Sequence, residues 1–172
     1  MRVKRGASSN TFCGPAALSL LTGRHVDKCV QEVHFYRRRL RGHALLCEDL
    51  DCCNSVRYSV SSMDKSEITR VLVRMGYTIN TAFHWELDKP KRKPTLVAFK
   101  RWLKRQPCWS PKKKYLVLVT GHYVVVKGIK LFDNANPDGV FFGKYNGRRR
   151  RVSQAWEVTR RAVCPVPSEP SR

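Results

Sequence analysis

Two apolar runs in the second half of the chain restrict its fold more than any other feature. Residues 115–119 and 122–126 are rich in β-branched and aromatic side chains, and Thr120 and Gly121 lie between them. Such runs predict strands, and residues 129–132 and 140–142 predict shorter ones. Helical patterns occupy the first half of the chain, so helices precede strands. This order predicts an α+β fold.

The first two helical patterns begin near the N-terminus. Pro15 suits a first helical turn and Gly23 suits a helix end. The mostly apolar residues between them predict a short helix that is buried on all sides. Residues 26–41 predict a second helix, whose apolar side is formed by Val26, Val30, Val33 and Phe35.

Two further helices are predicted from capping residues. Asp64 and Glu67 have the spacing of an N-cap residue and its N3 partner. They open a helix that Gly76 closes, with one apolar face made of Ile68, Val71, Leu72 and Met75. Thr95 caps a helix whose apolar face is made of Leu96, Phe99, Trp102 and Leu103.

The length of 172 residues fits one compact domain. We expect residues 1–10 to form a basic arm, 11–160 the domain and 161–172 a flexible, proline-rich tail. The N-terminus does not resemble a signal peptide, and the apolar stretches fall short of the ~20 residues of a membrane helix. Seven irregularly spaced cysteines then indicate reduced thiols in an intracellular setting, either host cytoplasm or a virion.

Positive charge is the strongest feature of the composition. The chain has 34 Lys and Arg against 13 Asp and Glu, a net charge of +21, and residues 91–172 hold most of the excess. Such a field attracts nucleic acid, anionic membranes or acidic proteins, and charge alone does not choose among them. We predict that the basic surface lies in loops and consists of Lys91, Arg92, Lys93, Lys112, Lys113, Lys114, Arg148, Arg149, Arg150 and Arg151.

Three residues form a candidate set for acyl transfer by cysteine. That chemistry needs a thiolate, a histidine within hydrogen-bond reach and a polar group that orients the imidazole ring. Cys13 stands at a predicted helix start, where aligned N–H dipoles stabilise a negative sulfur. His122 begins one strand and Asp133 follows the next, so antiparallel pairing would place them side by side.

We therefore predict Cys13 as nucleophile, His122 as base and Asp133 as the orienting group, with Asn134 as a second orienting candidate. Each residue also has a plainer interpretation when taken singly: a buried thiol, a histidine on a strand and a turn residue.

A metal site has less support. No CxxC pair occurs and adjacent cysteines do not match zinc-ligand spacing, so we expect no metal and no cofactor. The residues weighed for zinc are His25, Cys29, His34, His43, Cys47, Cys52 and Cys53. Tryptophans near the basic runs suit single-stranded nucleic acid, but no known nucleic-acid-binding motif occurs.

The motifs around the candidate set resemble a known family. Asn-Thr-Phe-Cys-Gly-Pro-Ala-Ala-Leu at residues 10–18, with Thr22 and Gly23, resembles the nucleophile helix of papain-like cysteine peptidases of the bacteriocin-processing branch. Residues 121–128 and 132–134 resemble that branch's histidine and aspartate strands. The chain is also similar to small papain-like proteins encoded by bacteriophages. The resemblance implies N-terminal helices that carry the nucleophile and pack on a C-terminal antiparallel sheet.

One position departs from the family pattern. The family has Gln six residues before the cysteine to complete the oxyanion hole, and this chain has Ala7 there. Asn10 is the nearest amide side chain and is our oxyanion candidate. Loss of one such donor costs on the order of a hundredfold in rate.

The resemblance implies a viral or phage-type thiol hydrolase that cleaves peptide or isopeptide bonds, or transfers the acyl group to an amine. Its basic surface would engage an acidic protein or nucleic acid. The alternative is a papain-like protein with little or no turnover, acting as a basic virion component bound to nucleic acid or as a host-protein-binding factor.

Overall fold

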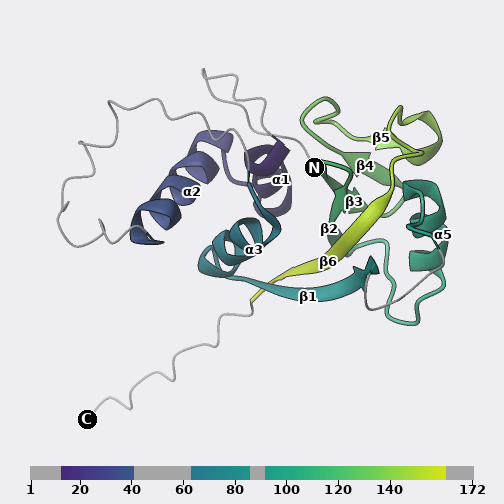
Figure 1. Ribbon diagram of the computed structural model, residues 1–172, viewed down its shortest axis with the longest axis horizontal. Helices are drawn as coiled ribbons and strands as arrows, with labels where there is room; N and C mark the ends of the chain where they lie inside the picture. The colour runs from purple at the N-terminus through teal and green to yellow at the C-terminus, as the bar shows by residue number, and fades with distance from the viewer. Residues whose placement is uncertain (1–12, 41–62, 86–91, 162–172) are drawn as a thin grey trace, which may run out of the picture.

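A single antiparallel sheet organises the part of the chain that the computed structural model describes, residues 13–40, 63–85 and 92–161 (Figure 1). Its six strands have the order β1-β6-β2-β3-β4-β5. The strands are β1 (Tyr77–His84), β2 (Lys114–Val119), β3 (His122–Lys127), β4 (Lys130–Phe132), β5 (Val140–Phe141) and β6 (Val152–Arg160). Together with the helices described below, the sheet confirms the predicted α+β class.

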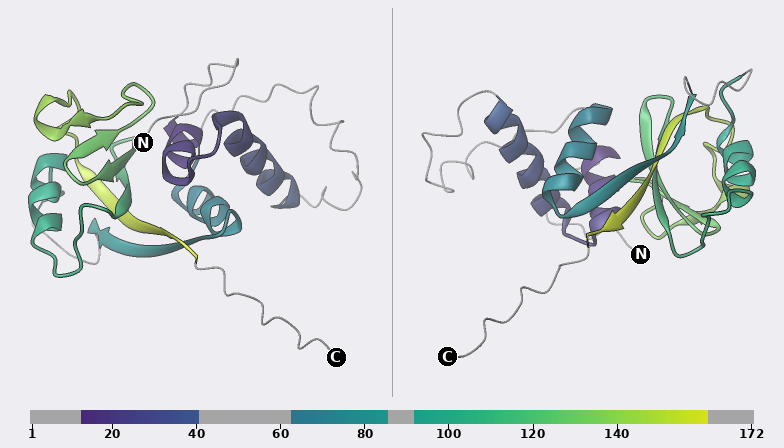
Figure 2. Two further views of the ribbon diagram at one scale, coloured as in Figure 1. Left: turned by 180° about the vertical axis from the view of Figure 1, so that it is seen from behind. Right: turned by 90° about the horizontal axis from the view of Figure 1, so that it is seen from below.

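Helix α1 (Cys13–Thr22) is the short apolar helix that the sequence predicts. All its residues from Gly14 to Leu21 are buried. Gly23 follows with φ of 74°, a left-handed conformation that glycine adopts without the Cβ penalty of other residues. The helix is buried on all sides because it lies between the sheet and the other N-terminal helices, as Figure 2 shows.

Helices α2 (Val26–Leu40) and α3 (Lys65–Arg74) complete the layer around α1. The predicted cap of α3 is confirmed, since the Asp64 carboxylate accepts a hydrogen bond from the Glu67 N–H at 2.7 Å. The placement of Phe35 on the apolar side of α2 is wrong, since Phe35 is 48% exposed. It lies about 200° around the helix from buried Val33 and packs beneath the Arg74 guanidinium.

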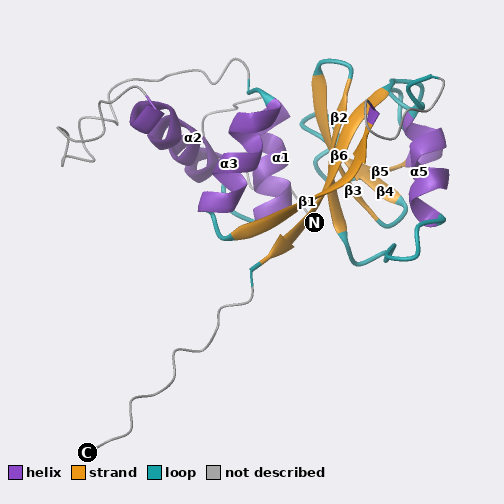
Figure 3. Cartoon of the chain, turned by 60° about the horizontal axis from the view of Figure 1, so that its bottom comes forward, coloured by secondary structure: helices purple, strands orange, loops and turns teal. Residues whose placement is uncertain are grey.

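The sheet separates two apolar cores, and Figure 3 shows its strands between the helices on either side. Because side chains alternate along a strand, Leu116 and Tyr123 face α1, α2 and α3, whereas Val117 and Val124 face the opposite side. Helix α5 (Leu96–Lys104) covers that opposite side through Leu96, Phe99 and Leu103. Thr95 caps α5 as predicted, accepting a hydrogen bond from the Ala98 N–H at 3.2 Å.

Two tight connections set the position of the candidate site. Val119 pairs with His122, so Thr120 and Gly121 alone form the turn between β2 and β3. Gly121 has φ of 66°, as such a turn requires. Strands β3 and β4 are also antiparallel, and the start of β3 therefore lies at the same end of the sheet as the end of β4.

The boundaries of the predicted domain are partly visible. Strand β6 ends at Arg160, and the Arg161 N–H donates to the Gly76 carbonyl at 2.9 Å. The predicted arm 1–10 and residues 162–172 of the predicted tail lie outside the described residues. Within the described ranges, no helix combines the length and apolar character that crossing a membrane requires.

Candidate active site

Cys13 is the first residue of α1, at the end of the helix where backbone N–H groups point outward. Its side chain is half-buried and packs against the core beneath the helical layer. The helix dipole favours a negative charge at this end, which suits a thiolate.

His122 and Asp133 meet at one end of the sheet. The His122 Nε2 lies 3.3 Å from the Asp133 Oδ2. The Asp133 carboxylate is only 4% exposed, and the imidazole is 16% exposed. The structure thus brings the Asp133 carboxylate, on the connection that leaves β4, to the imidazole.

Asp133 is held by donors that the sequence did not reveal. Its Oδ1 accepts from the Asn136 backbone N–H at 2.7 Å and from the Asn136 side-chain amide at 2.9 Å. Its Oδ2 also accepts from the Tyr145 hydroxyl at 2.8 Å. Burial alone would raise the pKa of Asp133, but hydrogen bonds from His122, Asn136 and Tyr145 hold it well below its usual range. The carboxylate is therefore ionised.

The signal for these two supporting residues is weak in the sequence. Asn136 belongs to a stretch of turn-forming residues, where a side chain that binds nearby backbone is common. Tyr145 follows a short 3₁₀ helix (Phe142–Lys144), and nothing in the local sequence separates it from an ordinary core tyrosine. Burial and the bond to Asp133 raise the pKa of Tyr145, which keeps its hydroxyl a donor.

His122 couples the carboxylate to the thiol. Its hydrogen bond to Asp133, followed by one to Cys13, raises its pKa to about 9 despite burial. Since Nε2 is engaged by Asp133, Nδ1 is the nitrogen left to interact with the sulfur. The imidazole is therefore protonated at neutral pH.

The pKa of the Cys13 thiol moves in the opposite direction. Burial raises it, but a hydrogen bond with His122, backbone hydrogen bonds from Tyr123 and Cys13, and the imidazolium charge together lower it below its ordinary value. A thiolate beside an imidazolium is the form that attacks carbonyl carbon.

The oxyanion side of the site is described in part. The Cys13 backbone N–H at the start of α1 is one candidate donor, because helix N-termini leave such groups without intrahelical acceptors. Asn10, the predicted side-chain donor, and Ala7 lie outside the described residues.

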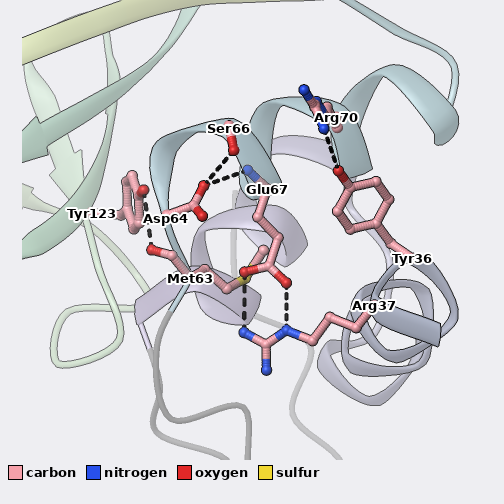
Figure 4. Close-up of polar contacts among 8 residues, drawn as sticks. All are labelled: Tyr36, Arg37, Met63, Asp64, Ser66, Glu67, Arg70 and Tyr123. Carbon is pink, nitrogen blue, oxygen red and sulfur yellow. Dashed lines mark hydrogen bonds and ion pairs between the residues drawn. The ribbon is translucent and has the colours of Figure 1, made fainter. Parts of the chain in front are cut away.

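Met63 lies beside Tyr123 and Asp64, just before α3 (Figure 4). The Tyr123 hydroxyl donates to the Met63 carbonyl at 3.3 Å. A Cβ on Gly14 would lie 2.5 Å from the Met63 sulfur, so the missing side chain of Gly14 makes room for Met63. Figure 4 also shows Asp64 beside Met63, where it caps α3. Met63 therefore packs against α1 at Gly14.

The predicted basic surface is only partly solvated. Lys113 pairs with Glu157 at 3.0 Å. Lys114 is the first residue of β2 rather than a loop residue, and its half-buried ammonium donates to the Leu21 carbonyl at 2.5 Å near the end of α1. Lys91 lies outside the described residues. The exposed members are Arg92, Lys93, Lys112, Arg148, Arg149, Arg150 and Arg151.

The residues weighed for zinc are dispersed where they are described. His25 lies beside Asp27, and Cys29 is buried in the core. Within the described ranges no three His, Cys, Asp or Glu side chains gather as a metal site would require. His43, Cys47, Cys52 and Cys53 fall outside those ranges.

Comparisons with known proteins give no further assignment. No family model, no curated protein and no solved structure matches the chain.

Proposed function

We propose that this protein is a thiol hydrolase of the papain-like type that cleaves peptide or isopeptide bonds. One observation carries the proposal: His122 interacts with the half-buried thiol of Cys13 and, through Nε2, with a buried, ionised Asp133. Structural thiols gain nothing from such an arrangement. Nucleophilic cysteines need it, because the neighbouring imidazolium keeps the sulfur ionised.

The reaction follows from the roles of these groups. The Cys13 thiolate attacks the carbonyl carbon, and the negative charge moves to the carbonyl oxygen beside the Cys13 N–H. The His122 imidazolium gives its proton to the leaving amine as the carbon–nitrogen bond breaks, leaving a thioester on Cys13. Neutral His122 then takes a proton from water, which attacks the thioester and releases the acid and the thiolate. An amine in place of water would give transamidation.

Asp133 acts by holding the imidazole. Its bond to Nε2 fixes the tautomer that presents Nδ1 to the sulfur, and its charge stabilises the imidazolium. The four hydrogen bonds that Asp133 accepts keep the carboxylate in place through both proton transfers. No cofactor enters these steps.

The test is cleavage of a diverse peptide mixture, followed by mass spectrometry of the products. The wild-type chain is compared with Cys13→Ala and with Cys29→Ala, a matched loss of a thiol from the core behind α1. We expect new peptide termini with the wild-type and Cys29→Ala proteins and none with Cys13→Ala. Equal cleavage by the Cys13→Ala protein, or no cleavage and no acyl-enzyme with any peptide or isopeptide substrate, would reject the proposal.

A further inference from the structure

We propose that the outer side of α5 and the segments packed at its start form a binding site for single-stranded nucleic acid. This surface, called the basic face below, comprises Arg92, Lys93, Lys100, Arg101, Lys104, Arg105, Arg148, Arg149, Arg150 and Arg151. The proposal does not depend on the hydrolase function, since it uses none of the groups at Cys13.

The fold gathers the basic face from three separate runs of sequence. The first N–H groups of α5, from Leu96 and Val97, donate to the carbonyls of Arg150 and Arg148 at 2.9 and 3.4 Å. The Arg151 guanidinium donates to the Lys93 carbonyl at 2.8 Å. The arginine run is thereby fixed at the start of α5, beside the segment that leads into it.

Residues 92–161, which contain the whole basic face, carry few acidic side chains. Helix α5 contains no acidic residue. Residues 92–161 contain three, of which Asp133 is buried in the candidate active site and Glu157 pairs with Lys113. The third, Asp138, lies in the turn before β5. Within residues 92–161 the cations of the basic face outnumber the carboxylates, and such an excess attracts a polyanion.

Aromatic rings lie among the cations, which favours a single strand over a duplex. The Lys104 ammonium lies 5.8 Å from the ring centre of half-buried Trp109, and the Lys93 ammonium lies 5.9 Å from that of half-buried Trp85. Unstacked bases can stack on such rings, whereas the bases of a duplex are already stacked on each other.

The basic face lies on the opposite side of the sheet from the helical layer. Figure 1 shows α5 on one side of the strands and α1, α2 and α3 on the other, and the two cores have the same division. A strand of nucleic acid along α5 would therefore leave the helix that carries Cys13 uncovered.

The test measures binding of a fluorescent oligothymidine of about 20 nucleotides by anisotropy. The full-length chain is compared with Arg101→Glu/Arg149→Glu, in which both replaced residues are exposed on the basic face. The control is Lys28→Glu/Lys65→Glu, which makes the same change of net charge at exposed positions in the helical layer. Cys13→Ala and a duplex of equal length complete the set.

We expect salt-dependent binding that Arg101→Glu/Arg149→Glu weakens about tenfold or more at low salt, with a shallower salt dependence. The control pair and Cys13→Ala retain most of the affinity, and Trp109→Leu weakens single-strand binding more than duplex binding. Equal losses of affinity in the two charge-reversed proteins would mean that net charge alone attracts the oligonucleotide, and would overturn the proposed binding site. Absence of binding at low salt, tighter binding of the duplex, or equal competition by polyglutamate would also overturn it.

Discussion

The Tyr145 hydroxyl and the His122 imidazole share one carboxylate oxygen. Both lie on the Oδ2 of Asp133, at 2.8 Å and 3.3 Å respectively. Tyr145 is buried in the core on the α5 side of the sheet and contacts the carboxylate of the His122–Asp133 pair from there. A residue of the apolar core therefore fixes the orientation of a polar group at the site.

Replacing Tyr145 by Phe removes this donor without a large change of volume. We expect a loss of about 1.5–3 kcal/mol in the free energy of unfolding at pH 7, the range for a hydrogen bond to a charged group. Tyr77→Phe is the matched control, since that hydroxyl donates to the neutral Thr22 carbonyl and its removal should cost about 0.5–1.5 kcal/mol. Urea denaturation measures both.

The pH dependence separates this charged bond from ordinary packing. Loss of the donor raises the pKa of Asp133 in the folded variant above its lowered wild-type value. The stability difference is therefore full at neutral pH and shrinks as the pH falls through the variant's Asp133 pKa. A difference that stays constant into acid would show that Tyr145 contributes packing alone.

The reactivity of Cys13 should reflect the ion pair with His122. Because the pKa of Cys13 is lowered, we expect iodoacetamide to alkylate it rapidly below the ordinary thiol pKa of about 8.5. In His122→Ala the lowering contacts of the imidazole are lost, and burial then raises the pKa of Cys13. Each unit of that increase should slow alkylation at pH 7 about tenfold, because the thiolate fraction falls by that factor. Mass spectrometry of the Cys13 peptide measures the rate, and the exposed Cys108 serves as an internal reference.

Hydrolysis and alkylation should diverge at high pH. Alkylation needs only the thiolate and continues to a plateau, whereas hydrolysis also needs the proton on His122 and should fall above about pH 9. The two limits belong to the coupled pair rather than to either residue alone. Parallel profiles for the two reactions would contradict the assignment of His122 as proton donor.

Gly14 should tolerate a side chain poorly. In Gly14→Ala the new methyl group would approach three side-chain atoms of Met63, the nearest at 2.5 Å. We expect a loss of about 1–2 kcal/mol, typical of overpacking, and slower Cys13 alkylation. Combining it with Met63→Ala should cost less than the sum of the single changes, because the two residues compete for one space. Strict additivity would show that Met63 does not restrict Gly14.

The ion pair between Arg37 and Glu67 joins α2 to α3 (Figure 4). Glu67 is nearly buried, with 10% of its side chain exposed. Glu67→Gln should therefore cost about 1–3 kcal/mol, between the values for exposed and buried pairs. Glu32→Gln at the more exposed pair with Arg24 is the control, for which we expect less than about 1 kcal/mol. Equal thermal stability of the two variants would contradict this ranking.

The sequence by itself determined the features that depend on near neighbours along the chain. The cap of α3 by Asp64 and the turn at Gly121 follow from local hydrogen bonding and backbone conformation. The apolar character of α1 required burial on every side. The alternation in β2 and β3 implied a sheet with two apolar faces. From these elements the candidate pair of His122 and Asp133 could be placed at one end of the sheet.

Only the tertiary structure decided which distant residues support that pair. Tyr145 and Asn136 bond to Asp133 because the chain that follows β4 folds back against the end of that strand. Met63 contacts Gly14 because α3 packs beside α1. Lys114 bonds to the end of α1, although its sequence context resembles a solvated loop. No local sequence pattern relates the residues of these contacts, because the contacts depend on how whole helices and strands pack against one another. Packing of complete elements, rather than local propensity, fixes these positions.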